Sequence, residues 1–182
     1  MAPFPNLTTS RLALRAPDER DIPAWFARAS DVESASLAGD PVPGDIGAGE
    51  AWLARSRRRF AEGGAIQWAM DEPGVSEAIG TITLSFAGDA RVAALGFVLG
   101  RAYWGRGLGS EAAREVLRHA FETLALERVT AEAATRNLAS LRILAKLGFQ
   151  QVESFIDPSD GEPCERLALE ASASRLALGP RP

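Results

Sequence analysis

Apolar and polar residues alternate in short stretches of the chain, and strands are expected there. Alternation over residues 10–15 predicts a first strand. Apolar runs at 65–70, 78–86 and 91–99 predict three more, separated by turns rich in Gly, Pro and Asp. Strands this close in sequence favour an antiparallel meander. Gly96 lies inside the last of them and predicts a bulge or a close backbone approach.

Apolar positions spaced three and four residues apart predict two early helices, over residues 18–30 and 48–62. A loop rich in Gly, Pro and Asp, residues 37–49, joins them. The arginine cluster at 55–59 is expected on a solvent-facing side of the second helix. Trp25 and Trp52 are expected in the core, with the lining of a pocket as the alternative.

The second half of the chain alternates between helical and strand patterns. An amphipathic run predicts a helix at 112–124, and a second helix at 138–147 is capped by Asn137 and stopped by Gly148. The tail from Ala171 is expected to be frayed or peripheral. The remaining strands are predicted at residues 128–134, 149–155 and 165–170. The predicted order is β-α-α-β-β-β-α-β-α-β-β.

A glycine-rich stretch, YWGRGLGSEA at residues 103–112, connects the fourth strand to the amphipathic helix. Glycine allows positive φ and close approach of a ligand. The first N–H groups of a helix have no partner within it, and the helix dipole favours an anion there. The stretch therefore predicts a cradle for a phosphate or pyrophosphate. The alternative is a flexible turn before an ordinary helix.

Two established phosphate-binding motifs fit this stretch poorly. A Walker A loop needs Gly-Lys-Ser/Thr, whereas the chain has Gly-Leu-Gly-Ser. A dinucleotide fingerprint needs a third glycine where Ser110 stands, and an acidic residue where the next strand ends at Ala133 and Ala134. A protein that binds ATP or NAD is therefore the least favoured interpretation.

Composition narrows the class of protein. With 182 residues, 46% of them hydrophobic, the chain suits a single domain with a sizeable core. A net charge of −4 gives no basic footprint for nucleic acid. The single cysteine, Cys164, fits a reducing compartment, and no apolar run reaches the roughly 18 residues of a membrane span. We expect a cytoplasmic protein with no membrane or nucleic-acid partner.

Three segments together resemble one enzyme family. They are TSRLALR at residues 9–15, the glycine-rich stretch at 103–112, and NLASLRILAKLGF at 137–149. The chain resembles the GNAT N-acetyltransferases, and within them the RimJ/RimL-type branch that acetylates ribosomal-protein N-termini. The resemblance implies an α/β (α+β) fold. Its mixed, mostly antiparallel sheet has about seven strands, splayed between the fourth and fifth, with about four flanking helices. It implies one domain, residues 1–182, with its core at about 9–170.

The resemblance also implies a binding site for acetyl-coenzyme A and no metal. Main-chain groups of Phe97, Val98 and Leu99 would bind the pantetheine arm, and Asn137 and Ser140 would contact the coenzyme. The pyrophosphate would lie on the loop formed by Trp104, Gly105, Arg106, Gly107, Leu108, Gly109 and Ser110.

The implied reaction is direct transfer of the acetyl group to an amine. A backbone N–H near Phe97 would stabilise the oxyanion. Ser140 is the remaining candidate to protonate the leaving thiolate, directly or through water, and the alternative is a small residue packed near the start of its helix. Two family residues are replaced: Leu144 stands where many members have a tyrosine, and Ala94 where many have a glutamate. Glu132 is a candidate base but is expected to face solvent.

The acceptor remains open between several classes. A protein or peptide N-terminal α-amine is the first hypothesis. A small amine such as an amino acid, polyamine or aminoglycoside is the second, and a non-catalytic acetyl-coenzyme A-binding module is the third. The early helices and the loop at 37–49 are expected to form the acceptor side. The sequence does not fix the oligomeric state, so a homodimer is left open.

Overall fold

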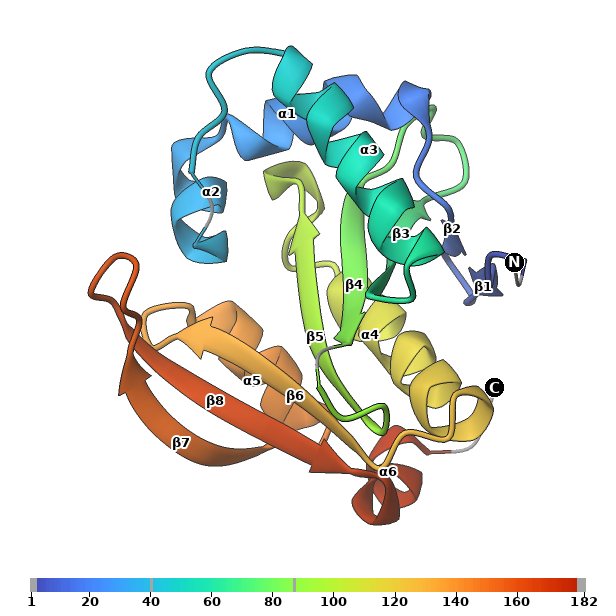
Figure 1. The fold of residues 1–182 in the computed structure, drawn as a ribbon, viewed down its shortest axis with the longest axis vertical. Helices are drawn as coiled ribbons and strands as arrows, with labels where there is room; N and C mark the ends of the chain where they lie inside the picture. The colour runs from blue at the N-terminus through green and yellow to red at the C-terminus, as the bar shows by residue number, and fades with distance from the viewer. Residues whose placement is uncertain (1–2, 40, 87, 180–182) are drawn as a thin grey trace.

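The computed structural model describes residues 3–39, 41–86 and 88–179. Within these residues, eight strands form one sheet in the order β1-β2-β3-β4-β5-β6-β8-β7 (Figure 1). Neighbouring strands are antiparallel, except for the parallel pair β5 and β6. The expected mixed, mostly antiparallel sheet is confirmed. The strands are β1 (Leu7–Thr8), β2 (Ala13–Arg15), β3 (Ala65–Asp71), β4 (Gly80–Phe86), β5 (Val92–Leu99), β6 (Arg128–Ala134), β7 (Gln150–Ile156) and β8 (Pro163–Glu170).

Six α-helices accompany the sheet within the described residues. The expected helices are present, and the one after the glycine-rich stretch begins at Leu108, four residues before the expected start. The helices are α1 (Ile22–Ala29), α2 (Val32–Ala38), α3 (Gly47–Ala61), α4 (Leu108–Arg118), α5 (Leu138–Lys146) and α6 (Ala171–Leu178).

Sequence patterns missed α2 and underestimated α6. The Asp31 side chain caps α2 by accepting from Ser34 N at 2.8 Å, and Gly39 ends the helix at φ 70°. The tail expected to be frayed instead folds into α6 over residues 171–178, with Leu178 buried in the main core. Residues 180–182 of that tail lie outside the described part of the chain.

The two faces of the meander β3-β4-β5 differ in chemistry because successive side chains alternate. One face is apolar and packs under α4, through residues such as Trp68, Ile82 and Leu95. The other face carries small and polar residues, including Gln67 and Thr83, and lies under α1 and α3 (Figure 1). One face therefore builds the core, and the other is left for a cavity.

The sheet opens between β5 and β6. Their parallel pairing covers only three residue pairs, from Val92–Arg128 to Ala94–Thr130. Beyond Ala94 the two strands diverge toward α2, which confirms the expected splay (Figure 1). Gly96 keeps a regular register opposite Thr83 on β4, so the expected bulge is absent from the β4–β5 pair. A Cβ built on Gly96 would meet no atom within 4 Å, which places open space above it.

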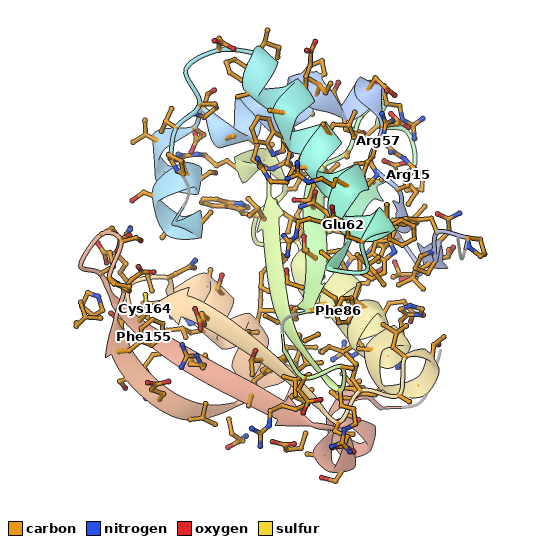
Figure 2. All side chains as sticks on the ribbon, viewed as in Figure 1. Arg15, Arg57, Glu62, Phe86, Phe155 and Cys164 are labelled. Atoms are coloured by element: carbon orange, nitrogen blue, oxygen red, sulfur yellow. The ribbon has the colours of Figure 1, made fainter. Side chains whose placement is uncertain are left out.

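A buried ion-pair network fixes α1 to the edge of the meander. Arg15 on β2 donates to both oxygens of Asp21, at 2.7 and 2.8 Å, and to Asp71 on β3. Asp21 also accepts from Asp18 N at 2.9 Å and from Ala78 N at 3.4 Å. Asp21 is only 1% exposed. Figure 2 shows Arg15 on the same side of the molecule as Arg57 of α3.

We predict that Asp21→Asn destabilises the protein by about 3 kcal/mol at neutral pH, because it breaks a buried ion pair. Burial by itself raises the pKa of Asp21, but the bonds from Arg15 and Asp18 outweigh it and lower that pKa. The stabilisation is therefore present above the unfolded carboxyl pKa of about 3.9 and is lost as pH falls through the lower folded pKa. Urea unfolding from pH 7 down to pH 3 measures this.

The matched control is Glu19→Gln, which removes an exposed partner of Arg57. It should leave the urea midpoint close to that of the wild type. Equal midpoints for Asp21→Asn and the wild type at pH 7 would show that the network does not hold α1.

Candidate active site

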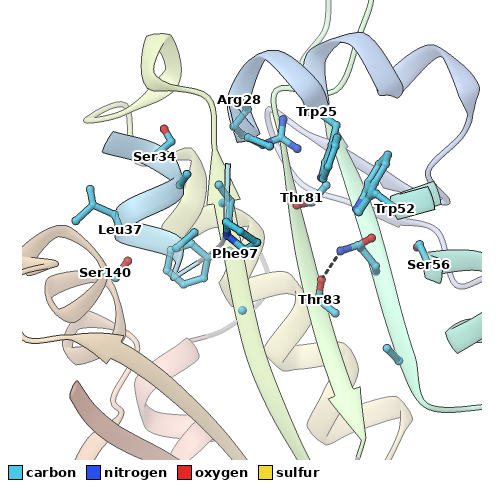
Figure 3. A pocket seen from close by; sticks show the side chains of 18 of the residues that line it. Trp25, Arg28, Ser34, Leu37, Trp52, Ser56, Thr81, Thr83, Phe97 and Ser140 are labelled. Atoms are coloured by element: carbon cyan, nitrogen blue, oxygen red, sulfur yellow. Dashed lines mark hydrogen bonds between the residues drawn. The ribbon is translucent and has the colours of Figure 1, made fainter. Parts of the chain in front are cut away.

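A cavity of about 640 Å³ lies where the sheet opens, between the early helices and α5. Its floor is the polar face of the meander, with Thr81, Thr83 and Gly96, and Gln67 donates to Thr83 Oγ1 at 3.1 Å (Figure 3). Trp25 of α1 and Trp52 of α3 stack at 5.3 Å between ring centroids to form one wall. The alternative expectation for these two tryptophans, that they line a pocket, is therefore confirmed.

Main-chain groups of β5 point into the opening. Alternate residues of a strand direct their N–H and C=O groups to opposite neighbours. Gly100 N donates to Ile79 O at 2.9 Å and Val98 O lies against Gly80, so even-numbered residues face β4. Odd-numbered residues face β6, as Arg91 O does by accepting from Arg128 N at 3.3 Å.

Because the β5–β6 ladder ends with the pair Ala94–Thr130, the main-chain groups of Phe97 face the gap. Leu99 also faces that side, but its carbonyl accepts the indole N–H of Trp104 at 2.8 Å. Val98 pairs with Thr81 within the sheet. Of the three residues expected to offer main-chain groups, Phe97 has both its N–H and its C=O directed at the opening.

The glycine-rich stretch forms a tight turn at the start of α4. Gly105 and Gly107 adopt φ of 73° and 78°, a conformation that other residues rarely take. Gly107 is the residue before the first helical turn, and its carbonyl accepts from Glu111 N at 3.1 Å. The N–H groups of Leu108 to Ser110 occupy the first turn, where a helix has no internal partners for them. The turn therefore presents donors and a positive dipole end to an anion.

The carboxylate of Glu111, in that first turn, is neutralised by the N-terminal segment. Thr9 Oγ1 donates to it at 2.6 Å, and Arg11 forms an ion pair with it at 2.6 Å. Arg11 also donates to Arg106 O at 3.0 Å, which ties the N-terminal segment to the loop. Although burial alone raises the pKa of Glu111, the bonds from Thr9 and Arg11 lower it, so its charge stays paired with Arg11.

Asn137 and Ser140 lie across the cavity from the tryptophan pair and line it. Asn137 Oδ1 caps α5 by accepting from Ser140 N at 3.1 Å. Its amide donates to Leu37 O at 3.1 Å, and Arg136 donates to Ser36 O at 2.8 Å. These bonds join the end of α2 to the start of α5 and close one end of the cavity.

The model of the "Acetyltransferase (GNAT) domain" family matches residues 11–150 of the chain. The chain belongs to the GNAT acetyltransferase family. It is 32% identical over 149 residues to the N-acetyltransferase YoaA of Bacillus subtilis (strain 168), covering 81% of this chain and 84% of that one. It is therefore an acetyl-coenzyme A-dependent acyltransferase by family.

Solved structures give the same fold. RimJ of Mycobacterium smegmatis, in complex with CoA-disulfide, matches with a TM-score of 0.79 at 20% identity, covering 93% of this chain and 88% of that one. Spermidine N-acetyltransferase of Vibrio cholerae, in complex with CoA and spermine, also matches with a TM-score of 0.79, at 14% identity and with 91% and 98% covered. At these identities the likeness concerns the fold alone, and it agrees with the expected GNAT fold.

Acid–base groups are sparse around this GNAT cavity. Among the described lining residues Glu132 is the one carboxylate, and it accepts from Arg166 Nε in an ion pair at 2.7 Å. Leu144, in place of the family's frequent tyrosine, is buried and lines the cavity. Tyr103, which is not among the lining residues, packs against the core instead. Ser140 is the hydroxyl at the α5 side of the cavity.

Three arginines line the cavity, contrary to part of the sequence expectation. Arg55, Arg57 and Arg58 of α3 are exposed, as expected, but Arg55 also lines the cavity, and Arg59 lines it as a half-buried residue. The helix turns these residues by about 100° each, so one cluster reaches two faces. The third, Arg28 of α1, was missed. Its position three residues after Trp25, on an otherwise apolar face, was the available signal.

Other candidates stand apart from the cavity. Cys164 is buried on β8 beside Phe155 (Figure 2), where burial raises the pKa of its thiol. No group of three or more His, Cys, Asp or Glu that could hold a metal occurs within the described ranges. In the same part of the chain, no helix is both long and apolar enough to cross a membrane.

We predict that Gly96→Val leaves folding intact but raises the KM for acetyl-coenzyme A at least about tenfold. The new side chain enters open space at the cavity floor, beside the free main-chain groups of β5, and occupies room that a ligand needs. Saturation kinetics with a fixed acceptor measure the change. The control Ala94→Val alters a residue on the same face of β5 but outside the cavity lining, and it should change neither the folding of the protein nor the KM for acetyl-coenzyme A. An unchanged KM in Gly96→Val would place the coenzyme elsewhere.

Proposed function

We propose that the protein transfers the acetyl group of acetyl-coenzyme A to a protein or peptide N-terminal α-amine, by direct attack within a ternary complex. The observation that carries the proposal is the cavity at the splayed strands. It brings the free main-chain groups of Phe97 and the acceptor-side helices into one space. Both reactants can meet there, and holding them together lowers the barrier.

The coenzyme would lie along β5 and end at the glycine-rich turn. Phe97 N–H and C=O would form hydrogen bonds with the pantetheine arm, which would take the place of a neighbouring strand. The N–H groups from Gly105 to Ser110 would hold the pyrophosphate, with Trp104, Arg106 and Leu108 shaping the turn. Asn137 and Ser140 would contact the coenzyme from α5. The positive φ values of Gly105 and Gly107 support this assignment, since they turn successive N–H groups toward one side.

The chemistry needs an oxyanion donor and a proton donor. The acceptor nitrogen forms a bond to the acetyl carbonyl carbon, and the oxyanion that develops accepts from a backbone N–H near Phe97. The C–S bond then breaks, and the thiolate takes a proton from Ser140. The proton that the amine releases to water returns to the Ser140 oxygen, so the net transfer runs from the amine to the thiolate. An α-amine, with a pKa of about 7.7–8.0, loses that proton far more readily than a lysine. This suits a cavity in which Glu132 is already paired.

Two alternatives to a peptide acetyltransferase remain, one with a different acceptor and one without catalysis. A small-molecule amine is favoured by the bridge between α2 and α5, which closes one end of the cavity. A non-catalytic coenzyme-binding module is suggested by the replacement of the family's tyrosine by Leu144. Turnover of acetyl-coenzyme A with each class of acceptor separates the three hypotheses.

The test is release of free coenzyme A thiol from acetyl-coenzyme A, measured with peptides of varied N-termini, free amino acids, polyamines and aminoglycosides. We expect release with peptides that carry a free α-amine, and none with the same peptides blocked by N-terminal acetylation. Release confined to small amines would replace the peptide hypothesis. Silence with every acceptor, together with tight coenzyme binding, would favour the non-catalytic module.

Ser140→Ala should lower kcat about tenfold or more while leaving the affinity for coenzyme A nearly unchanged, because it removes the proton donor and keeps the α5 cap made by Asn137. Rapid-quench kinetics and calorimetry measure the two quantities. Ser140→Thr, which keeps a hydroxyl, should recover part of the rate. An equal kcat in Ser140→Ala and wild type would leave Ser140 with a packing role only.

A further inference from the structure

Arg28 is a buried cation without a direct partner. It projects from α1 into the cavity near Trp25 and Thr81 (Figure 3), and only 8% of the residue is exposed. Within the described residues, no hydrogen bond and no ion pair is made by its guanidinium. A charge that is mostly buried is normally paired, because removing it from water is costly. The Arg28 nitrogens are not among the fully buried polar atoms that lack a partner, so they are open to the cavity.

Asp21, the acidic residue whose charge acts on Arg28, cannot serve as its direct partner. Asp21 acts on Arg28 at a distance, but each of its oxygens already accepts two hydrogen bonds, one from Arg15 and one from the backbone N–H of Asp18 or Ala78. Burial lowers the pKa of Arg28 to about 10, which still leaves the guanidinium protonated at neutral pH. The cavity therefore contains a permanent positive charge with unfilled donor capacity.

The other unneutralised charges along the cavity lining are also positive. Arg55 and Arg59 line it from α3, while the one carboxylate among the described lining residues, Glu132, is held by Arg166. A protein with a net charge of −4 thus concentrates positive charge where the acceptor enters. Polycationic amines are disfavoured there by repulsion, and an anionic group is attracted.

We propose that the acceptor carries a carboxylate close to its reacting amine, and that Arg28 binds this carboxylate. The inference rests on the proposed acetyl transfer and names the acceptor class for the same site. The flat guanidinium offers parallel N–H donors that match a carboxylate in a two-point bond. The stacked Trp25–Trp52 pair would position the remainder of the acceptor beside it.

A carboxylate near an α-amine has two sources: the α-carboxylate of a free amino acid, or the side chain of an acidic residue at a peptide N-terminus. Two matched pairs of acceptors separate them. The first pair is L-alanine and L-alaninamide. The second pair is a C-terminally amidated peptide that begins with Asp and the same peptide beginning with Asn. In each pair only one carboxylate is replaced by an amide.

The test measures kcat/KM for both pairs in the wild type, in Arg28→Met and in the control Arg58→Met, which alters an exposed arginine of α3 outside the cavity lining. For at least one pair we expect the wild type to prefer the carboxylate. Arg28→Met should reduce that preference about ten- to a hundredfold, as expected for loss of a charged hydrogen bond. Arg58→Met should keep it, and the KM for acetyl-coenzyme A should not change.

A second readout does not depend on turnover. With coenzyme A present, calorimetry compares the binding of N-acetyl-L-alanine and the N-acetylated Asp peptide with that of their amide counterparts. Arg28→Met should weaken only the carboxylate forms. It should also melt at or above the wild-type temperature, because it removes an unpaired buried charge. A purely structural arginine would instead lower the melting temperature and leave the carboxylate preference intact.

The outcomes separate the two proposals. No thiol release by the wild type with any acceptor contradicts the proposed transfer, and the binding experiment then decides the role of Arg28. The carboxylate inference would be overturned if the wild type released thiol with neutral or cationic amines and the ratio of kcat/KM for acid over amide were the same in the wild type and Arg28→Met. The transfer reaction would then still stand.

Discussion

The short pairing between β5 and β6 constrains everything around the cavity. A parallel ladder of full length would bond the main chain of both strands and leave no space between them. Here the ladder ends at Ala94 and Thr130, and the strands diverge. The backbone groups of Phe97 then lack a neighbouring strand, and unpaired backbone groups in a partly buried site require another partner. A ligand with amide groups of its own is the partner that fits this gap.

The elements on both sides of the gap keep it open. The Arg15–Asp21–Asp71 network anchors α1 over the polar face of the meander. Bonds from Arg136 and Asn137 to the end of α2 join the early helices to α5. The cavity is thus framed by interactions between segments far apart in the sequence, while its floor carries side chains too small to fill it. The same frame holds Arg28 in place with its donors free.

Much of the fold and the glycine-rich turn were predictable from sequence, because these depend on local patterns. Strand alternation located the meander, and the glycines at 105 and 107 marked a turn whose positive φ values the structure contains. The helices on the other side of the cavity were not predictable in the same way. α2 is short and its cap at Asp31 is a weak signal, and Leu178 is buried only through a contact with a distant part of the core. Arg28 is a candidate because its guanidinium has no partner among the described residues, and only the folded structure shows this.

The most direct test of the account is residue-resolved amide hydrogen exchange by NMR, with and without coenzyme A. We predict that exchange at the Phe97 amide slows strongly on binding, because the coenzyme replaces the missing strand. Exchange at Val98, whose carbonyl already faces β4 within the sheet, should change little. Saturating coenzyme that leaves the exchange of Phe97 unaltered would contradict the placement of the reaction at the splayed strands.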